Sequence, residues 1–216
     1  MPFFLSSVQN NFPDVELADD DGLLAFGSNL SVETLLKAYK KGIFPWYNED
    51  EPISWYSPNP RFVLFPGKLN ISNSMRTVLN NHSFKFSVDR DFAGVIKNCR
   101  LAKRKGEAGT WITDDIEEAY LSLFKNGIAH SAEAWVNGEL KGGLYGVQLG
   151  KVFFGESMFS SESNASKFAF IKYVKFLQES GVELVDCQVY TAHLESLGAE
   201  FISRQDFTKL LGKLLG

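Results

Sequence analysis

Several segments of the chain repeat apolar side chains at the spacing of an α-helix. In the clearest of them, Ile116, Tyr120 and Leu123 fall on one helix face. Thr113, before this run, is suited to cap a helix N-terminus, and Gly127, after it, is suited to end the helix. The same reasoning predicts further helices over residues 31–41, 72–80, 91–100, 164–180 and 207–215.

Shorter segments rich in β-branched and aromatic residues predict strands between these helices. Residues 129–136 and 140–148 are joined by Asn137-Gly138, a pair typical of a tight hairpin turn. Further strands are predicted over residues 61–65, 84–88, 151–154, 183–190 and 200–204. Strands and helices that alternate in this way indicate an α+β fold, in which helices cover a mixed sheet.

The N-terminal part of the chain has a different pattern. After the predicted helix at 31–41, residues 43–60 are rich in aromatic side chains and proline. Because proline lacks a backbone N–H donor, we expect neither a regular helix nor a central strand there, but a pocket wall built of loops or a junction between domains. The predicted division is a small N-terminal domain over residues 1–62 and a larger domain over residues 63–216.

The composition is that of a folded globular chain. Of its 216 residues, 44% are hydrophobic and 30 are aromatic, which is enough to fill a core. No apolar run approaches the roughly 20 residues of a membrane-spanning helix, and the N-terminus lacks the basic start of a secretory signal. Cys99 and Cys187 are too few for a disulfide framework. We expect a cytoplasmic protein, and a monomer because the sequence shows no coiled-coil pattern.

Charge is distributed unevenly along the sequence. The formal net charge is −4, yet residues 61–110 contain ten basic and three acidic side chains. The basic residues cluster near the end of this segment, at Lys97, Arg100, Lys103, Arg104 and Lys105. Such a cluster attracts polyanions in a salt-dependent manner, although an ordinary solvated helix face and loop would have the same composition.

Common catalytic and cofactor motifs are missing from the sequence. The glycine-rich segment 138–150 has the spacing of neither a P-loop nor a dinucleotide-binding loop, and a β-meander punctuated by glycine explains it better. His82, His130 and His193 lack the serine elbow of a hydrolase triad. They also lack metal-ligand spacing to one another and to the cysteines, so we expect no metal site.

Two segments combine polar groups with apolar surroundings. The first, residues 153–160, places Glu156 among aromatic and thioether side chains at the end of a predicted strand. A carboxylate there can pair with a cationic amine while its neighbours bind a hydrophobic side chain, unless it simply points to water. The second, residues 184–190, contains Asp186 and Gln188, which the two-residue period of a strand puts on one face. An Asp in an apolar strand indicates either an active site or a structural network.

A set of motifs, taken together, resembles one protein family. The motifs are Gly42-Ile-Phe-Pro-Trp46, Trp55-Tyr-Ser-Pro58, Gly109-Thr-Trp111-Ile, Gly155-Glu-Ser-Met-Phe-Ser160, Asn164-Ala-Ser-Lys167, and Asp186-Cys-Gln188 with His193-Leu-Glu-Ser-Leu-Gly198. They occur in register from about Asp21 to beyond Gly198, nearly the whole chain. In this order they closely resemble the bacterial leucyl/phenylalanyl-tRNA–protein transferases.

The resemblance implies a fold and an activity. The family has a small N-terminal domain joined to a larger domain similar to the GCN5-related N-acetyltransferases. Its members transfer leucine or phenylalanine from aminoacyl-tRNA to proteins with an N-terminal arginine or lysine, marking them for N-end-rule degradation. No metal or nucleotide cofactor is expected. Leu144, Tyr173 and Val185 look like substitutions in the apolar pocket, which would shift the preference among leucine, phenylalanine and methionine.

The resemblance also implies roles for individual residues. By it, Trp46 and Trp111 contact the 3′-terminal adenosine of the tRNA, and Glu156 lies near the donor's α-amino group. The apolar pocket for the donor side chain is formed by residues that include Phe153, Met158 and Val185, with Leu144 and Tyr173. Asp186 and Gln188 are placed at the catalytic centre, and the basic cluster is the candidate contact for tRNA phosphates.

Two questions stay open at the level of the sequence. Asp186 either orients Gln188, whose amide oxygen accepts a hydrogen bond from the attacking amine, or acts itself as a general base. Two other functions are also considered: an acyl-CoA-dependent N-acetyltransferase and a non-catalytic RNA-binding module. The first would need a pyrophosphate-binding loop that the sequence lacks, and the second leaves Glu156, Asp186 and Gln188 unexplained.

Overall fold

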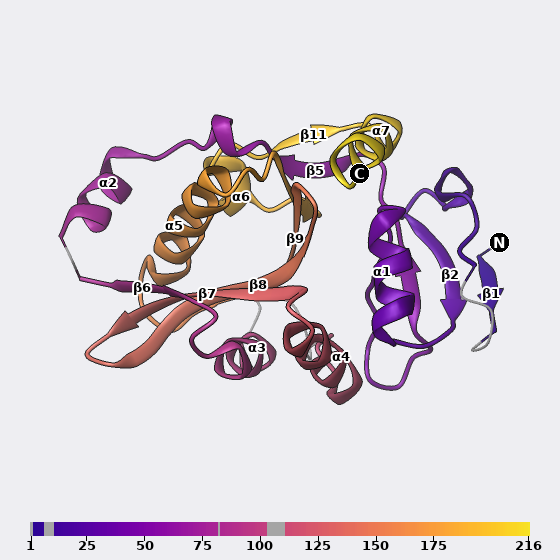
Figure 1. Cartoon of the computed structure of the whole chain (residues 1–216), viewed down its shortest axis with the longest axis horizontal. Helices are drawn as coiled ribbons and strands as arrows, with labels where there is room; N and C mark the ends of the chain where they lie inside the picture. The colour runs from indigo at the N-terminus through magenta and orange to yellow at the C-terminus, as the bar shows by residue number, and fades with distance from the viewer. Residues whose placement is uncertain (1, 7–10, 82, 103–110) are drawn as a thin grey trace.

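The chain contains two β-sheets, the smaller of which lies in its N-terminal part. A computed structural model describes residues 2–6, 11–81, 83–102 and 111–216. The elements of the small sheet and its surroundings are β1 (Phe3–Leu5), η1 (Val15–Leu17), β2 (Leu23–Gly27), α1 (Val32–Lys40), β3 (Phe44–Pro45) and β4 (Ser54–Tyr56). The sheet order is β1-β2-β4-β3, with β1 parallel to β2 and the other pairs antiparallel. Figure 1 shows this sheet and α1 at one end of the molecule.

The central position of β4 contradicts an expectation from the sequence. Residues 43–60 were predicted to lack a central strand because of their prolines, yet β4 pairs with β2 on one side and β3 on the other. Pro45 lies in the edge strand β3, whereas none of the three residues of β4 is a proline. The backbone N–H groups of β4 therefore remain available for hydrogen bonds to the neighbouring strands. Trp55 fixes β4 further, because its buried indole Nε1 donates to the carbonyl oxygen of Gly27 at 2.8 Å.

The larger sheet has seven strands in the order β11-β5-β10-β9-β8-β7-β6. These strands are β5 (Arg61–Leu64), β6 (Lys85–Val88), β7 (Ala129–Val136), β8 (Glu139–Leu149), β9 (Val152–Ser160), β10 (Leu184–Gln188) and β11 (Glu200–Ile202). β9 and β10 are parallel and all other neighbours are antiparallel. The predicted α+β class with a mixed sheet is confirmed.

Helices cover both faces of the larger sheet. They are η2 (Pro66–Lys68), α2 (Asn73–Asn80), α3 (Phe92–Leu101), α4 (Asp114–Lys125), α5 (Ala165–Glu179), α6 (Ala192–Ser196) and α7 (Arg204–Leu214). α3 and α4 lie on one face and α5 on the other (Figure 1). One apolar cluster joins α3 and α4 to the sheet and continues into the small sheet and α1, and a second fills the space under α5. The predicted cap Thr113 is confirmed, since its hydroxyl accepts the backbone N–H of Ile116 at 3.3 Å, and Ser31 caps α1 in the same way, accepting the N–H of Thr34 at 3.3 Å.

β9 extends further than predicted, and it separates from β10 partway along its length. Residues 152–154 of β9 pair with residues 184–186 of β10, but beyond this point β9 continues to Ser160 paired with β8. The predicted strand stopped at residue 154, so the expectation that Glu156 lies at a strand end was wrong. Glu156 lies within β9, just past the point where β9 and β10 separate.

Among the residues that the structure describes, no helix combines the length and the apolar character needed to cross a bilayer.

Candidate active site

A cavity of about 430 Å³ opens where β9 and β10 separate. Its lining includes residues 44–46, at and just after β3 of the small sheet, Trp111, residues 155–158 of β9 and residues 185–188 of β10. Leu144, Phe170 and Leu194 contribute an apolar wall. A cavity of this size and composition can enclose an amino acid side chain together with part of a nucleoside.

Most of the predicted substrate-binding residues meet in this cavity. Its lining includes Trp46, Trp111, Leu144, Glu156, Met158 and Val185. Phe153 and Tyr173 lie behind the wall, where their rings pack edge to face with centroids 5.0 Å apart. Phe170, which the sequence did not single out, lines the cavity one helical turn before Tyr173. Phe153 and Tyr173 therefore support the pocket wall from the core.

A β-bulge presents Glu156 to the cavity. Tyr145 pairs with Ser157 and Gly146 with Gly155, so Glu156 is the extra residue of β9 and has no partner on β8. A bulge of this kind redirects a side chain out of the regular pleat.

Three side chains from distant parts of the sequence hold the Glu156 carboxyl group. Tyr39 of α1 donates to Oε1 at 2.7 Å, and Tyr120 of α4 donates to Oε2 at 2.8 Å. Gln188, at the end of β10, donates through Nε2 to Oε1 at 2.8 Å. The two tyrosine hydroxyl oxygens also lie within hydrogen-bond distance of each other. Since each hydroxyl has one proton, a bond between them would replace one of the two bonds to Glu156. Because α1 connects β2 and β3 of the small sheet and α4 covers the large one, the position of Glu156 depends on both parts of the molecule.

Burial raises the pKa of Glu156 to about 7, and the nearby charge of Asp186 adds to this rise. Hydrogen bonds from Tyr39, Tyr120 and Gln188 oppose it, since they stabilise the ionised carboxylate. Burial also raises the pKa of both tyrosines well above its usual value, so they remain donors at neutral pH. Glu156 therefore exchanges its proton near neutrality, and a bound cation would favour the carboxylate form.

Asp186 forms a buried ion pair with Arg61. The guanidinium donates from Nε to Oδ1 at 2.8 Å and from Nη2 to Oδ2 at 2.7 Å, with side chains only 1% and 0% exposed. The rings of Phe44 and Phe207 lie 4.8 and 4.6 Å from the guanidinium carbon. This arrangement satisfies both carboxylate oxygens within the protein.

Asp186 also fixes the backbone at Gln188. β10 is irregular between these two residues, and Gln188 has a φ of 63°, which is rare for a residue other than glycine. The backbone N–H of Gln188 donates to Asp186 Oδ1 at 2.9 Å. The regular strand predicted through residue 190 was thus wrong: β10 ends at Gln188, and Asp186 holds the backbone of Gln188 while the amide group bonds to Glu156.

Arg61, Tyr39 and Tyr120 were missed as site residues by sequence reasoning. The sequence contained one indication for Arg61: it is a charged residue that begins a predicted apolar strand, and a charge that becomes buried there needs a partner of opposite sign. Tyr39 and Tyr120 fall on the apolar faces of their helices, where the sequence pattern predicts ordinary core residues. Nothing in the sequence alone marks their hydroxyl groups as functional.

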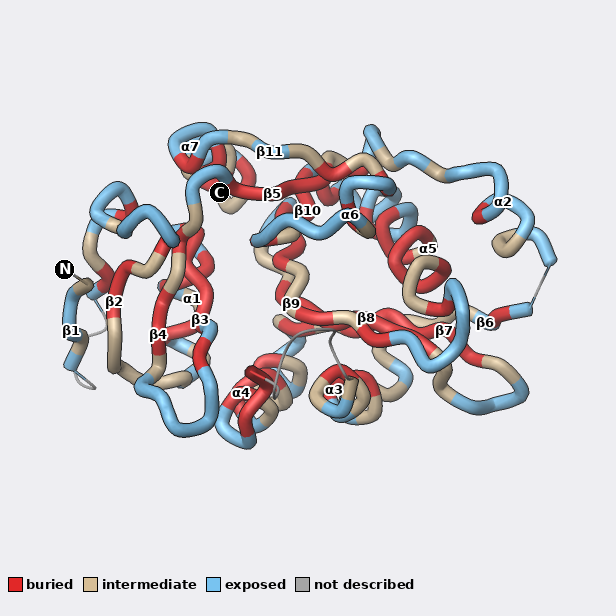
Figure 2. Tube along the Cα trace, turned by 180° about the vertical axis from the view of Figure 1, so that it is seen from behind, coloured by how far each residue is buried: buried red, intermediate tan, exposed pale blue. Residues whose placement is uncertain are grey.

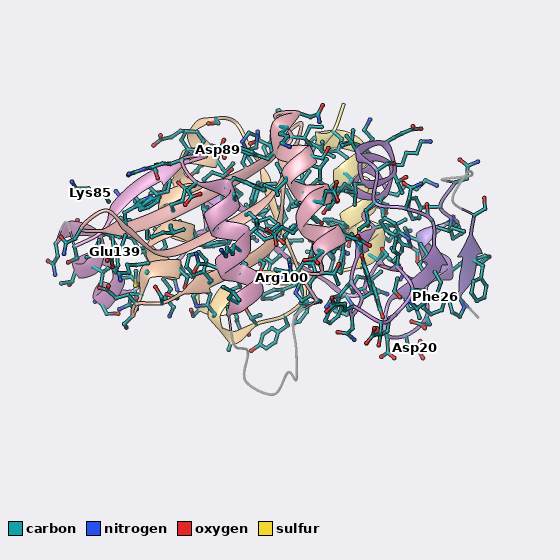
Figure 3. The ribbon with its side chains drawn as sticks, turned by 90° about the horizontal axis from the view of Figure 1, so that it is seen from below. Asp20, Phe26, Lys85, Asp89, Arg100 and Glu139 are labelled. Carbon is teal, nitrogen blue, oxygen red and sulfur yellow. The ribbon has the colours of Figure 1, made fainter. Side chains whose placement is uncertain are left out.

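The basic cluster is only partly described by the structure. Lys97 is exposed on α3, whereas Arg100 forms ion pairs with Asp114 and, at 3.2 Å, with Glu117. Figure 3 shows Arg100 on the underside of the molecule. Lys103, Arg104 and Lys105 lie outside the described residues. Lys97 is therefore the member of the cluster, among those described, whose charge is most available to a phosphate.

In the part of the chain that the structure describes, no group of three or more His, Cys, Asp or Glu side chains is arranged to hold a metal ion.

Comparison with known proteins identifies close relatives along nearly the whole chain. The family model described as leucyl/phenylalanyl-tRNA protein transferase matches residues 63–212, and the model of that family's N-terminal domain matches residues 28–59. A leucyl/phenylalanyl-tRNA–protein transferase of Christiangramia forsetii is 55% identical over 205 residues, covering 94% of this chain and 97% of the relative.

Solved structures show a more distant likeness, at the level of the fold alone. A structure described as L-PGS from Bacillus licheniformis has a TM-score of 0.47 and 13% identity, covering 90% of this chain and 72% of that one. A GCN5-related N-acetyltransferase from Kribbella flavida has a TM-score of 0.41 and 10% identity, covering 79% and 60%.

Proposed function

The chain belongs to the leucyl/phenylalanyl-tRNA protein transferase family and is an aminoacyltransferase, and we propose that its donors are leucyl- and phenylalanyl-tRNA. The observation that carries this proposal is the cavity between β9 and β10, where an apolar wall lies next to Glu156 and Gln188. The acceptors that we propose are proteins with an N-terminal arginine or lysine, which the added residue marks for N-end-rule degradation.

The donor side chain is proposed to bind the apolar wall formed by Leu144, Met158, Phe170 and Val185. This wall has room for leucine or phenylalanine, and its flexible Met158 would also adapt to methionine. Glu156 would pair with the α-ammonium group of the donor, which favours the carboxylate form of a side chain whose pKa is about 7.

The terminal adenosine is proposed to lie against Trp46 and Trp111 of the cavity lining. Trp46 is 43% exposed and Trp111 is buried, and both line the cavity. A nucleobase on such rings gains about 1–3 kcal/mol from stacking. The exposed Lys97 is our proposed contact to a tRNA phosphate, together with Lys103, Arg104 and Lys105 and, more weakly, the paired Arg100.

The reaction needs no external energy source, because the donor is already an activated ester. The neutral α-amine of the acceptor attacks the ester carbonyl carbon, a C–N bond forms, and the C–O bond to the 3′ oxygen of the ribose breaks. The amine loses a proton, and the ribose hydroxyl that leaves gains one. An α-amine has a reference pKa of about 7.7–8.0, so a useful neutral fraction exists near pH 7.

We propose that Gln188 contacts the attacking amine and that Asp186 acts as a positioning residue. Gln188 uses Nε2 to bond to Glu156, which orients its amide oxygen as an acceptor for the amine N–H. Both oxygens of Asp186 already accept from Arg61, and Oδ1 also accepts from the Gln188 backbone. A carboxylate held in this way is better suited to fix Gln188 than to remove a proton.

A transfer assay tests the proposed function. Phe-tRNA and Leu-tRNA carrying labelled amino acids are incubated with the protein and with peptides that begin with arginine, lysine or alanine. We expect label on the arginine and lysine peptides, and none on an arginine peptide whose N-terminus is acetylated. Equal labelling of all peptides would contradict the acceptor proposal, and absence of labelled peptide would contradict the transfer itself.

A further inference from the structure

Large apolar side chains, two of them aromatic, are exposed on the surface where β10 ends. Val189, Tyr190 and Phe201 are 40%, 47% and 51% exposed, which is high for large apolar side chains. The rings of Tyr190 and Phe201 stack with centroids 5.8 Å apart, and both pack on the buried ring of Phe62, at 5.4 and 4.8 Å. We call the surface formed by Val189, Tyr190 and Phe201 the aromatic ledge.

The aromatic ledge is continuous with the cavity. Val189 and Tyr190 line the cavity directly after Gln188, and Phe201 extends the surface along β11. β11 is the last strand of the larger sheet, so one of its edges has no partner strand among the described residues (Figure 2). An extended polypeptide that leaves the cavity beside Gln188 would therefore meet aromatic rings and a sheet edge, both of which suit a peptide.

The charge beside the aromatic ledge favours a polypeptide over an RNA as its occupant. Glu195 is exposed, and its Oε2 accepts the hydroxyl of Tyr190 at 2.8 Å. It forms no ion pair with any residue that the structure describes. Glu200, near Phe201, pairs with Lys68 at 2.5 Å. A carboxylate at this position repels the phosphates of an RNA and attracts a polypeptide whose first residue is cationic.

We propose that the aromatic ledge docks the acceptor polypeptide, in extended form, at the residues that follow its N-terminal arginine or lysine. This proposal rests on the proposed function. Gln188 and Phe201 both pair with Phe62 of β5, so they lie about two strand spacings, roughly 10 Å, apart. Extended chain advances about 3.3–3.6 Å per residue, so an acceptor whose amine lies at Gln188 reaches Phe201 within about three residues. Glu195 then attracts the cationic first residue. The acceptor terminus has to be unfolded over at least these residues to reach the cavity.

The test compares a short acceptor with a long one. Arginine amide has the reacting amine but no chain to dock, whereas an arginine-initiated decapeptide with apolar residues at positions two and three has both. The variant Phe201→Thr changes the aromatic ledge without touching the cavity lining, and Tyr190→Leu provides a second change. Phe4→Thr, which replaces an 87% exposed ring on β1, is the matched control.

The expected result is selective for the long acceptor. Wild-type protein has a lower KM for the decapeptide than for arginine amide. Phe201→Thr raises the decapeptide KM by about five- to tenfold, the loss of one aromatic contact, and leaves the kinetics with arginine amide and the KM for Phe-tRNA unchanged. Tyr190→Leu also raises the decapeptide KM, and Phe4→Thr behaves as wild type.

Several outcomes would overturn the docking proposal while leaving the proposed function intact. These are an unchanged decapeptide KM in both variants, an equal rise for both acceptors, or a rise in the KM for Phe-tRNA, which would make the aromatic ledge an RNA contact. If wild-type protein labels neither acceptor, the proposed function fails first, so the two failures are distinguishable.

Discussion

Burial strongly raises the pKa of the Glu156 carboxyl group, and this pKa links stability to function. Its folded-state pKa of about 7 lies above the value of about 4.3 in an unfolded chain. Below about pH 4.3, Glu156 is protonated in both the folded and the unfolded state, so the folded state does not have to bury a charged carboxylate. As pH rises towards 7 the unfolded state ionises first, so the free energy of unfolding falls.

We predict that Glu156→Gln removes this fall in stability. Between pH 5 and pH 8, the free energy of unfolding of wild-type protein should drop by about 3 kcal/mol more than that of Glu156→Gln. Urea unfolding at the two pH values measures the difference. Glu139→Gln, a change at an exposed carboxylate on β8, should keep the wild-type drop. Parallel pH dependence in wild type and Glu156→Gln would contradict the perturbed pKa.

Variants of the ion pair between Arg61 and Asp186 distinguish its effect on stability from its effect on catalysis. Arg61→Met leaves a buried carboxylate without its partner, which should lower the free energy of unfolding by about 3–5 kcal/mol. The double change Arg61→Met with Asp186→Leu removes both charges and should recover most of that stability. Its kcat should stay low, because the Gln188 backbone has lost its acceptor. Denaturant unfolding and transfer kinetics check both parts, and full recovery of kcat in the double variant would show that the pair serves folding alone.

At the scale of elements, the bulge in β9 decides where Glu156 points. Gly146 on β8 pairs with Gly155 directly beside the bulge, and a methyl group on Gly146 would lie 2.2 Å from the carbonyl oxygen of Phe154. This distance is far below van der Waals contact, so the backbone at Phe154 or at position 146 would have to move. The bulge is therefore compatible with glycine and with no larger residue at position 146.

We predict that Gly146→Ala destabilises the fold by about 1–3 kcal/mol and also lowers transfer activity in the folded fraction, because the bulge shifts. Gly212→Ala in α7, where an added methyl group meets no atom within 4 Å, is the control and should be neutral or slightly stabilising. Thermal unfolding and single-turnover transfer provide the two measurements. Normal activity in folded Gly146→Ala would show that Glu156 does not depend on the bulge.

The elements differ in how well the sequence predicts them. α4 was predicted almost to the residue, because its apolar face, its cap and its stop all lie within one short window of sequence. β9 was cut short at residue 154, because its second half is defined by pairing with β8 rather than by its own pattern. β10 was predicted too long, since the turn at Gln188 is set by the hydrogen bond from Gln188 to Asp186.

At the scale of the whole molecule, the site is built from segments that are far apart in the sequence. Tyr39 lies 117 residues from Glu156, and Arg61 lies 125 residues from Asp186. The carboxyl groups of the site were identified from the sequence because a buried charge is conspicuous in an apolar strand. Their partners were not, because a single sequence carries no signal for which distant residue completes a pair.

The N-terminal part of the chain contributes directly to the cavity through Trp46, which follows β3 and lines the cavity together with Trp111. We predict that Trp46→Ala raises the KM for Phe-tRNA about tenfold, as expected for the loss of one stacked base. Trp46→Phe keeps an aromatic surface and should stay within about threefold of wild type. Steady-state transfer at saturating acceptor measures both values. An unchanged KM in Trp46→Ala would place the adenosine elsewhere.

Single-turnover transfer by Gln188→Ala tests the central claim most directly, namely that the cavity holds the esterified amino acid while Gln188 aligns the incoming amine. Labelled Phe-tRNA is bound to excess protein, an arginine-initiated peptide is added, and peptide-bound label is followed in time. We expect the rate constant of transfer to fall at least about a hundredfold in Gln188→Ala, with the Kd for Phe-tRNA within about threefold of wild type. A rate constant close to that of wild type would contradict the account.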